Sequence, residues 1–451
     1  MTSQARAHWS IPEGVQTKET GPEFAQLKKD ILAQYGKDNI WKGWLQVTKL
    51  LAEENRRIVE RGSSSWAEID FGDIGRVSEE KIGEIKRTGV VVIRNVFSEA
   101  QARQWLSSLG EYLEKNTPAI KGFPEKDPWL YRSYFSPVQN EVRTHPRSLE
   151  AQEFLNRLWH GYSANTALPT PLTYADSLRF RRPGGFAATV RPHIDAGSLE
   201  RWGDETYRRY YDGVFSGDVL SHDPYDITWR IEADSAKYPG KQQSSVFRAF
   251  QGWTSLSTSG GGFAKGALAA YPAVGLAIAY VLLRPFFKPP QSGSLDPTEW
   301  EWDDSSTFPG AWEGQSQQLS PSTHPHLELE KTLALTPVIN PGDAVFWHSD
   351  VVHAVDPIHE GPDPATVLYI PAVPLTKRNV EYLQGQKRAA LNDGETPPDF
   401  AAWGAHYEGG FEGYQSIDTI TGPQGRQALG LSRFPGEEYI SQWANEILAQ
   451  G

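Results

Sequence analysis

The chain has 451 residues, of which 39% are hydrophobic and 12% aromatic, so it can bury a large core. Its net charge of −12 argues against nucleic acid or an anionic membrane as partner, because both attract clustered positive charge. The sequence contains no cysteine, which excludes disulfides, zinc–thiolate sites and a cysteine nucleophile. Any metal ligand must therefore be nitrogen or oxygen, and chemistry on a small molecule is the expectation.

The amino-terminal region, residues 1–110, is predicted to be a helical lead-in that contains the first strand. In chain order the predicted elements are two helices within 22–62, a helix at 78–87, a strand at 89–94 and a helix at 98–113. Ser98 is of a residue type favoured at a helix N-cap. The first residues lack the apolar core of a secretory signal, so a cytoplasmic protein is expected.

The middle of the chain, residues 111–375, is predicted to hold the core of the fold. A helix near 149–160 precedes a strand at 178–182. Residues 203–235 are predicted to form a tyrosine-rich helix. Residues 288–325 are rich in Pro, Ser, Gly and Trp, which predicts a long surface loop that either closes over a site or packs as an insertion.

The most apolar run lies at 273–283. A bilayer span needs about twenty apolar residues, so this shorter run predicts a buried helix rather than a membrane segment. The tail, residues 376–451, is predicted to be a helical extension that packs on the core and ends in a helix at 436–450.

The pattern that indicates chemistry begins with His193 and Asp195. Side chains two apart on an extended strand point to the same face, so this pair can hold one cation. An isolated His-x-Asp pair is often only a structural hydrogen bond. However, a turn at 341–343 leads into a short apolar strand and then to His353, which would complete a set of two imidazoles and one carboxylate. Such a set leaves other positions of an octahedral Fe(II) open for a chelating co-substrate and O2.

Spacing alone does not choose the third ligand, because His348 and His359 lie near His353. We select His353, which follows the strand after a bend, and leave His348 open as a group beside the ligands. The alternation of the strand places Val345 and Trp347 on one face. These two residues either line a substrate cavity or belong to the core. Glu200 and Arg201 are candidates to orient Asp195 or His193.

Several ordered stretches resemble the Fe(II)/2-oxoglutarate-dependent oxygenase superfamily. They are residues 177–184, 192–202, 247–256, 282–287, 342–353 and 367–375. More narrowly, they resemble a family long described only as of unknown function, with bacterial and fungal members, some of which act on amino acids. The resemblance implies an α+β fold, mostly β with α: a double-stranded β-helix, or jelly-roll, core decorated with N- and C-terminal helices. It also implies Fe(II) held by His193, Asp195 and His353, with 2-oxoglutarate and O2 as co-substrates.

One feature departs from the superfamily's pattern. Many members carry an arginine ten to thirteen residues beyond the distal histidine, where it binds the remote carboxylate of 2-oxoglutarate. Here residues 361–369 contain no basic side chain. Arg248 and Arg179 are the candidate replacements, each of which could instead be a buried structural arginine. Thr366 could add a hydroxyl contact at the position that the usual arginine occupies.

The expected activity is oxidation of an unactivated C–H bond of a small molecule, with release of succinate and CO2. An amino-acid-like substrate is expected, with hydroxylation or an oxidative cyclisation such as aziridine formation as the outcome. The missing arginine keeps open a cupin-like metalloenzyme that does not use 2-oxoglutarate. A non-catalytic small-molecule-binding barrel and a carbohydrate-binding β-sandwich are further alternatives. The sequence predicts neither the substrate's identity nor the oligomeric state.

Overall fold

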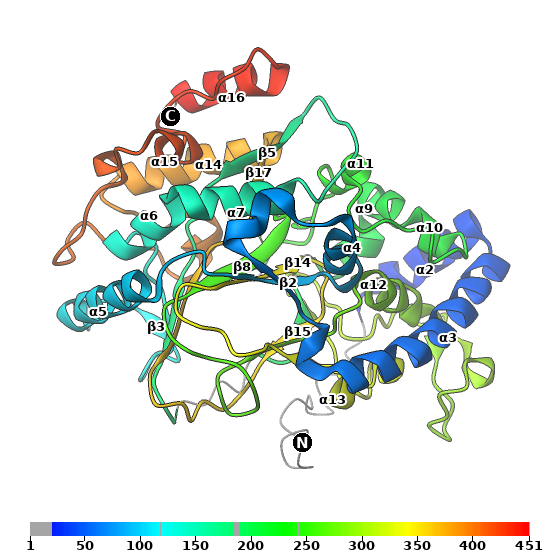
Figure 1. The fold of residues 1–451 in the computed structure, drawn as a ribbon. Helices are drawn as coiled ribbons and strands as arrows, with labels where there is room; N and C mark the ends of the chain where they lie inside the picture. Colours follow the sequence, from blue (N-terminus) through cyan, green and yellow to red (C-terminus); the bar gives the residue numbers. More distant parts are fainter. Residues whose placement is uncertain (1–19, 118, 185–189, 196, 241–243, 451) are drawn as a thin grey trace.

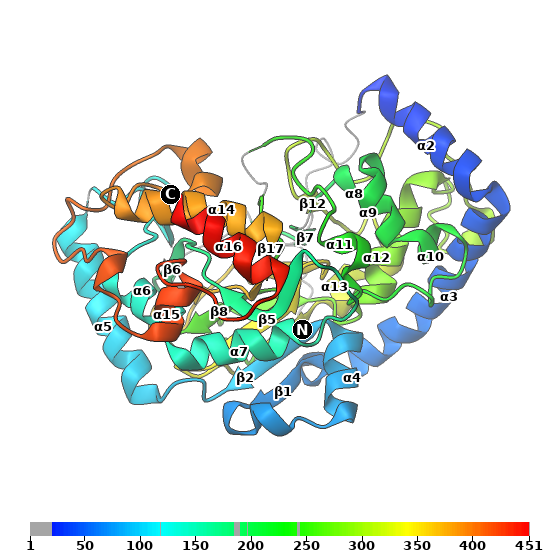
Figure 2. The ribbon, with the colours of Figure 1, turned by 90° about the horizontal axis from the view of Figure 1, so that it is seen from above.

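The computed structural model describes residues 20–117, 119–184, 190–195, 197–240 and 244–450. Two large β-sheets are surrounded by helices, so the predicted mixture of strands and helices is confirmed (Figure 1, Figure 2). Within these residues the sheets are not hydrogen bonded to each other into one closed barrel. Nor does any helix among them have the length and apolarity to cross a bilayer. The first nineteen residues, on which the prediction about a secretory signal rests, lie outside the described part.

The larger sheet has eight strands, and all neighbours are antiparallel except β1 and β2, which are parallel. In spatial order they are β1 (Ala67–Asp70), β2 (Val90–Arg94), β14 (Ala344–His348), β8 (Phe250–Ser255), β16 (Ala365–Tyr369), β6 (Leu178–Arg181), β4 (Leu130–Tyr131) and β3 (Gly122–Phe123).

The smaller sheet has five short antiparallel strands. In spatial order they are β12 (Gln317–Gln318), β7 (His193–Ile194), β15 (His353–Val355), β9 (Leu268–Ala270) and β13 (Ala334–Leu335). Two separate pairs complete the strands: β10 (Phe287–Lys288) with β11 (Glu301–Trp302), and β5 (Thr166–Leu172) with β17 (Val373–Thr376).

The larger sheet separates two hydrophobic clusters, as side-chain alternation requires. On β14, Val345 and Trp347 belong to the cluster that also contains residues of the smaller sheet. Ala344 and Phe346 belong to the cluster on the opposite face. The strand therefore has the two faces predicted from its sequence.

The predicted helices of the lead-in are confirmed. They are α2 (Pro22–Tyr35), α3 (Lys37–Arg61), α4 (Glu79–Thr88) and α5 (Glu99–Asn116). The side chain of Ser98 accepts a hydrogen bond from the backbone N–H of Gln101, so it is the N-cap of α5. Together with α6 (Pro137–Thr144) and α7 (Pro146–Asn156), α5 contributes to the cluster on the face of the larger sheet that is remote from the smaller sheet.

The prediction of one helix over 203–235 was wrong. The segment forms short helices separated by turns: α8 (Glu200–Gly203), α9 (Glu205–Tyr210), α10 (Asp212–Phe215) and α11 (Ile227–Arg230). Gly217 has a positive φ of 82°, a conformation that ends a helix. The tyrosines Tyr207 and Tyr211 are fully buried, so their rings fill the core between the turns.

The prediction of a surface loop over 288–325 is confirmed only in part: residues 289–296 are irregular and mostly exposed, whereas the residues that follow pack as an insertion. Trp300 and Phe308 are buried at 3% and 1% exposure, and β12, within this segment, pairs with β7. Composition rich in Pro and Gly predicts irregular backbone correctly, but it does not show that the aromatic side chains anchor that backbone to the core.

The apolar run forms the buried helix α12 (Val274–Leu283), as predicted, and it packs on α3. The remaining α-helices are α13 (Leu329–Thr332), α14 (Lys377–Leu391), α15 (Pro423–Ala428) and α16 (Tyr439–Ala449). Helices α14 and α16 share a cluster with β5 and β17 (Figure 2). The division of the chain at residues 110 and 375 stays a prediction.

Candidate metal centre

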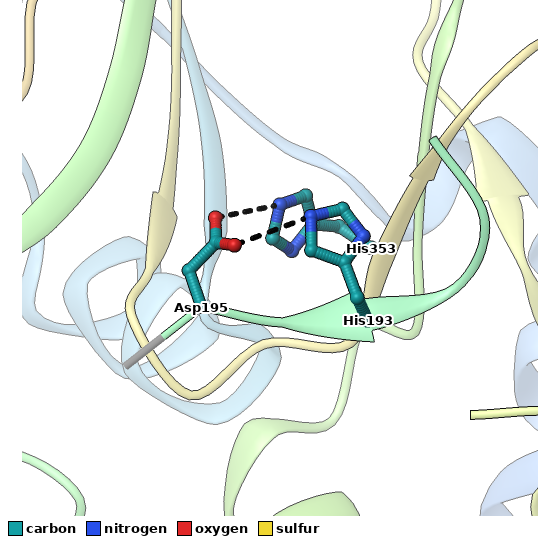
Figure 3. Close-up of side chains that lie close together, drawn as sticks. All are labelled: His193, Asp195 and His353. Atoms are coloured by element: carbon teal, nitrogen blue, oxygen red, sulfur yellow. Dashed lines mark ion pairs between the residues drawn. The ribbon is translucent and has the colours of Figure 1, made fainter. Parts of the chain in front are cut away.

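The smaller sheet brings His193 and His353 together. Strands β7 and β15 are antiparallel neighbours, and these two histidines are directly opposite in their register. Asp195 follows β7, and one ligand atom from each of the three side chains lies within 4.8 Å of the other two (Figure 3). Asp195 Oδ1 is 3.4 Å from His193 Nε2, and Asp195 Oδ2 is 3.5 Å from His353 Nε2.

Backbone carbonyls fix the proton position on both histidines. His193 Nδ1 lies 2.6 Å from the carbonyl oxygen of Arg191, and His353 Nδ1 lies 3.0 Å from that of Val351. A carbonyl oxygen only accepts, so each Nδ1 carries the proton and each Nε2 keeps a lone pair directed at Asp195. This is the tautomer that a histidine bound to a metal through Nε2 requires.

Burial and neighbouring groups shift the pKa values of His193 and Asp195 in ways that suit a metal ligand set. Burial lowers the pKa of His193, and the neighbouring His353 lowers it further. Burial opposes ionisation of Asp195, but the adjacent histidines hold the pKa of its carboxyl well below the ordinary value. The three groups therefore present two nitrogen donors and one anionic oxygen donor to a common point.

Gln251, which was not predicted from the sequence, holds Asp195 in place. Trp347, which was predicted only as a cavity or core residue, holds Gln251. Gln251 Nε2 donates to Asp195 Oδ2 at 2.6 Å, and Trp347 Nε1 donates to Gln251 Oε1 at 3.1 Å. Gln251 and Trp347 are directly opposite on β8 and β14. A buried glutamine within an otherwise apolar or hydroxyl-bearing strand was the available signal for Gln251.

A cavity of about 230 Å3 lies at the three side chains, between the two sheets. Its walls include predicted residues (Arg179, Arg248, Trp347) and polar residues not predicted (Asp176, Ser177, Gln251, Tyr369). Val345 is fully buried and is not among the described residues that line this cavity. Trp347 thus faces the cavity, whereas Val345 packs in the core.

Arg179 is the buried cation of this cavity. It lies on β6 directly opposite Val367 of β16, the strand on which the resemblance expects an arginine. Its Nε and Nη2 atoms are buried and have no hydrogen-bond partner among the described residues. Burial lowers the pKa of the guanidinium, and the nearby Tyr369 and Asp356 oppose this lowering only in part.

The structure places Thr366 away from the cavity. Val367 belongs to the cluster on the cavity side and Leu368 to the opposite one, so Thr366 shares the face of Leu368. Its hydroxyl donates to the carbonyl oxygen of Pro364 at 3.3 Å. The expected hydroxyl contact at this position is therefore not supported by the strand's alternation.

The other two histidines have structural partners elsewhere. His348 stacks on Trp159 with ring centroids 4.9 Å apart, and its Nε2 lies 2.9 Å from the carbonyl oxygen of Pro224. His359 Nε2 lies 2.8 Å from the carbonyl oxygen of Asp363. Neither belongs to the group of potential ligands found among the described residues.

Glu200 and Arg201 hold the turn that follows Asp195 rather than the ligand itself. Glu200 Oε2 accepts from the backbone N–H of Ser198 at 2.6 Å. Arg201 Nη1 donates to the carbonyl oxygen of Gly197 at 2.6 Å and to Gln317 Oε1 at 3.0 Å. These contacts fix the backbone beyond Asp195 against β12.

Comparison with known proteins gives similarity over nearly the whole chain. The family described as Gig2-like matches residues 18–431. The uncharacterised protein YbiU of Escherichia coli (strain K12) is 33% identical over 424 residues, which cover 90% of this chain and 95% of YbiU. The structure of GlcNAc Inducible Gene 2 from Candida albicans is 27% identical with a TM-score of 0.86, and 96% of each chain is covered. A Salmonella typhimurium LT2 protein, whose name assigns it provisionally to the oxidoreductases, is 29% identical with a TM-score of 0.76, covering 92% of this chain and 99% of its own.

Proposed function

The chain belongs to the Gig2-like family, and for this member we propose the activity of a non-haem Fe(II)- and 2-oxoglutarate-dependent oxygenase acting on a small molecule. The observation that carries the proposal is the convergence of His193, Asp195 and His353, with both Nε2 lone pairs and the carboxylate directed at one point. The family membership agrees with the narrower resemblance predicted from the sequence motifs.

The order of the strands supports a double-stranded β-helix as the core. From β6 to β9 and again from β13 to β16, successive strands alternate between the larger and the smaller sheet. A chain that winds in this way produces two facing sheets, with a cavity between them that residues of both sheets line. His193 begins β7, Asp195 directly follows that strand and His353 begins β15, so the candidate ligands come from neighbouring strands of the smaller sheet.

The donor set fits Fe(II). Two imidazole nitrogens and one carboxylate are the facial ligand set of non-haem iron oxygenases, and thiolate ligands are excluded because the chain has no cysteine. When bound, Fe(II) would supply O2 activation coupled to conversion of 2-oxoglutarate to succinate and CO2, with oxidation of a C–H bond of the substrate.

The residues of the chain would divide the remaining tasks. Gln251 holds the Asp195 carboxylate through its 2.6 Å hydrogen bond, and Trp347 in turn holds Gln251. Arg179 supplies the buried guanidinium to which the remote carboxylate of 2-oxoglutarate would bind. Trp253, Trp347 and Tyr369 form aromatic walls that limit the access of water and the size of the substrate.

The decisive test is anaerobic titration of the metal-free protein with Fe(II) and then with 2-oxoglutarate. The titration is monitored by visible absorption, in which a complex of Fe(II) with 2-oxoglutarate gives a metal-to-ligand charge-transfer band. We expect a weak band that is absent in the His193→Ala/Asp195→Ala double variant. We also expect Arg179→Gln to bind Fe(II) normally but to need at least tenfold more 2-oxoglutarate to reach half of the band.

A cupin-like metalloenzyme without 2-oxoglutarate is the second candidate, because residues 361–369 contain no basic side chain. This second candidate predicts that the protein binds iron, that adding 2-oxoglutarate produces no absorption band, and that no substrate leads to release of succinate. Iron binding without the band would therefore replace the first proposal by the second.

A further inference from the structure

The strand that carries His193 is covered along its outer edge by residues 303–319, a segment called the strap below. The end of the strap forms β12, the edge strand of the smaller sheet, in which Gln318 is directly opposite His193. Earlier in the strap, the backbone N–H of Trp312 donates to Ser198 Oγ at 3.0 Å. The strap is therefore attached to β7 and to the turn that follows it, so a movement of the strap would reach the candidate ligands.

Helix α2 contacts the first part of the strap and lies at the edge of the molecule (Figure 2). The ring of Phe24 packs edge-on against Phe308, with ring centroids 6.0 Å apart. Just before the helix, the hydroxyl of Thr20 donates to the carbonyl oxygen of Ser306, and the hydroxyl of Ser306 donates to the carbonyl oxygen of Thr20. Docking of α2 thus fixes the strap from the outside.

The contact between α2 and the strap contains a buried cation, Lys28. Its side chain is completely buried, and its Nζ lies 3.5 Å from Asp303 Oδ1 and 5.3 Å from the ring centre of Phe308. An ammonium group can donate three hydrogen bonds, yet this Nζ makes none within the described ranges. Burial lowers the pKa of Lys28 to about 8; Asp303 opposes this shift, whereas Arg284 adds to it. The charge of Lys28 is therefore only partly compensated.

A lysine at this position weakens the docking of α2. Taking the ammonium group out of water costs free energy that one long ion pair does not recover, and the group returns to water when the helix detaches. The other two buried side chains of α2, Phe24 and Ile31, favour docking because they are apolar. These opposing contributions within one peripheral helix favour a local opening that needs less free energy than global unfolding.

We propose that α2 and the strap form a reversible latch for the metal site. In the closed state α2 holds the strap against β7, and in the open state α2 leaves the strap, β12 loosens and His193 is held less firmly beside His353. A metal ion binds the closed state better, so the ion and the latch stabilise each other. This inference goes beyond the proposed activity, because it requires only that the ligand set holds a metal ion.

The first experiment uses the absence of cysteine from the chain, since a single introduced thiol then reports opening without background. Three buried positions carry the thiol in separate variants: Ile31→Cys in α2, Ala311→Cys in the strap and Ile278→Cys in α12. The metal-free full-length protein is labelled with a maleimide dye at constant pH, and labelling is followed by intact mass. We expect the first two thiols to react at least tenfold faster than the third, which reports global unfolding.

The charge of Lys28 is tested in these cysteine variants. Lys28→Met keeps the length of the side chain and removes the charge, so it should slow labelling of both Ile31→Cys and Ala311→Cys at least tenfold. Lys29→Met is the matched control, because Lys29 is exposed on the same helix, and it should change the rates less than twofold. Circular dichroism confirms that each variant is folded.

The counter-charge gives a change in the opposite direction. Asp303→Asn keeps the acceptor for the Ser305 N–H but leaves Lys28 without its ion pair, so labelling of Ile31→Cys should become at least fivefold faster. Asp304→Asn, at the exposed neighbouring position, should have less than a twofold effect.

The latch is overturned if the thiols in α2 and the strap react no faster than the one in α12, or if Lys28→Met leaves their rates unchanged. A response of Ile31→Cys without a response of Ala311→Cys would show that α2 detaches alone, which also overturns the latch.

The second experiment repeats the labelling of Ala311→Cys anaerobically with saturating Fe(II), which should slow the reaction at least fivefold. An unchanged rate in protein that has bound Fe(II) would overturn the link between the strap and the metal site. Failure to bind Fe(II) would overturn both the latch and the proposed function. Slower labelling with Fe(II) but no absorption band with 2-oxoglutarate would overturn only the oxygenase proposal, and the latch would stand.

Discussion

Replacement of Gln251 by leucine tests whether a residue outside the ligand set controls the metal site. Leucine has a similar size but removes the donor to Asp195 Oδ2 and the acceptor of the Trp347 indole N–H. Outer partners of metal ligands typically contribute a factor of about 10 to 100 in metal affinity. We therefore expect the Fe(II) dissociation constant to rise by about that factor.

The same variant should also lose stability without metal. The Trp347 side chain is buried at 5% exposure, and a buried donor without an acceptor costs about 1–3 kcal/mol. Urea unfolding of the metal-free protein should show a decrease of that size. Fe(II) affinity is measured anaerobically by competition with a chromophoric chelator.

Trp347→Phe is the matched control, because it removes only the donor to Gln251 and keeps an aromatic ring in the cavity. It should weaken Fe(II) binding by less than tenfold, and the double variant should be no weaker than Gln251→Leu alone, since both act through one chain of contacts. The reasoning is refuted if Gln251→Leu binds Fe(II) within twofold of wild type while its stability falls as expected.

Three further predictions concern His348, Val345 and Arg179. Burial lowers the pKa of His348 to about 4, below its unfolded value near 6.5. This histidine's contribution is therefore complete above pH 6.5 and is lost as the pH falls towards 4. Between pH 6.5 and 5 the unfolding free energy should therefore fall by about 2 kcal/mol because of His348. In His348→Gln the unfolding free energy measured with urea should depend less on pH; an unchanged pH dependence would contradict a neutral His348 in the folded protein. Val345→Ala should reduce the unfolding free energy by about 1–3 kcal/mol because the side chain is fully buried, with an unchanged substrate range once a substrate is known. Arg179→Gln should raise at least tenfold the 2-oxoglutarate concentration needed for half-maximal succinate release, whereas Thr366→Val, on the face of the sheet remote from the cavity, should not; equal effects would remove Arg179 from the co-substrate's site.

Local sequence patterns predicted correctly those features that depend only on residues close in the sequence. The N-cap at Ser98 and the two faces of β14 are set within a few residues, and both are as expected. The pair His193 and Asp195 follows from alternation on one strand, but its approach to His353 depends on the pairing of β7 with β15. His353 was selected from the neighbouring histidines because it follows the strand after a bend, and the resemblance to known oxygenases implies the same residue.

Contacts between distant segments could not be predicted in the same way. Gln251 acquires its role only when β8 and β14 come into register. Arg179 was a candidate to bind the remote carboxylate and Thr366 a candidate to add a hydroxyl contact, and they differ because the pairing of β6 with β16 sets which faces of the sheet they occupy. The burial of Trp300 and Phe308 likewise depends on docking with segments elsewhere in the chain.

The strand that carries His193 has only two residues, and its partners on either side, β12 and β15, come from much later in the chain. Closing such long loops costs conformational entropy that so short a strand cannot offset alone. The ligand set should therefore form only when the rest of the protein is folded, and an ion held by it would bind the native state in preference to the unfolded chain. Metal supply in the cell would then set the lifetime of this protein against proteolysis, as well as its activity.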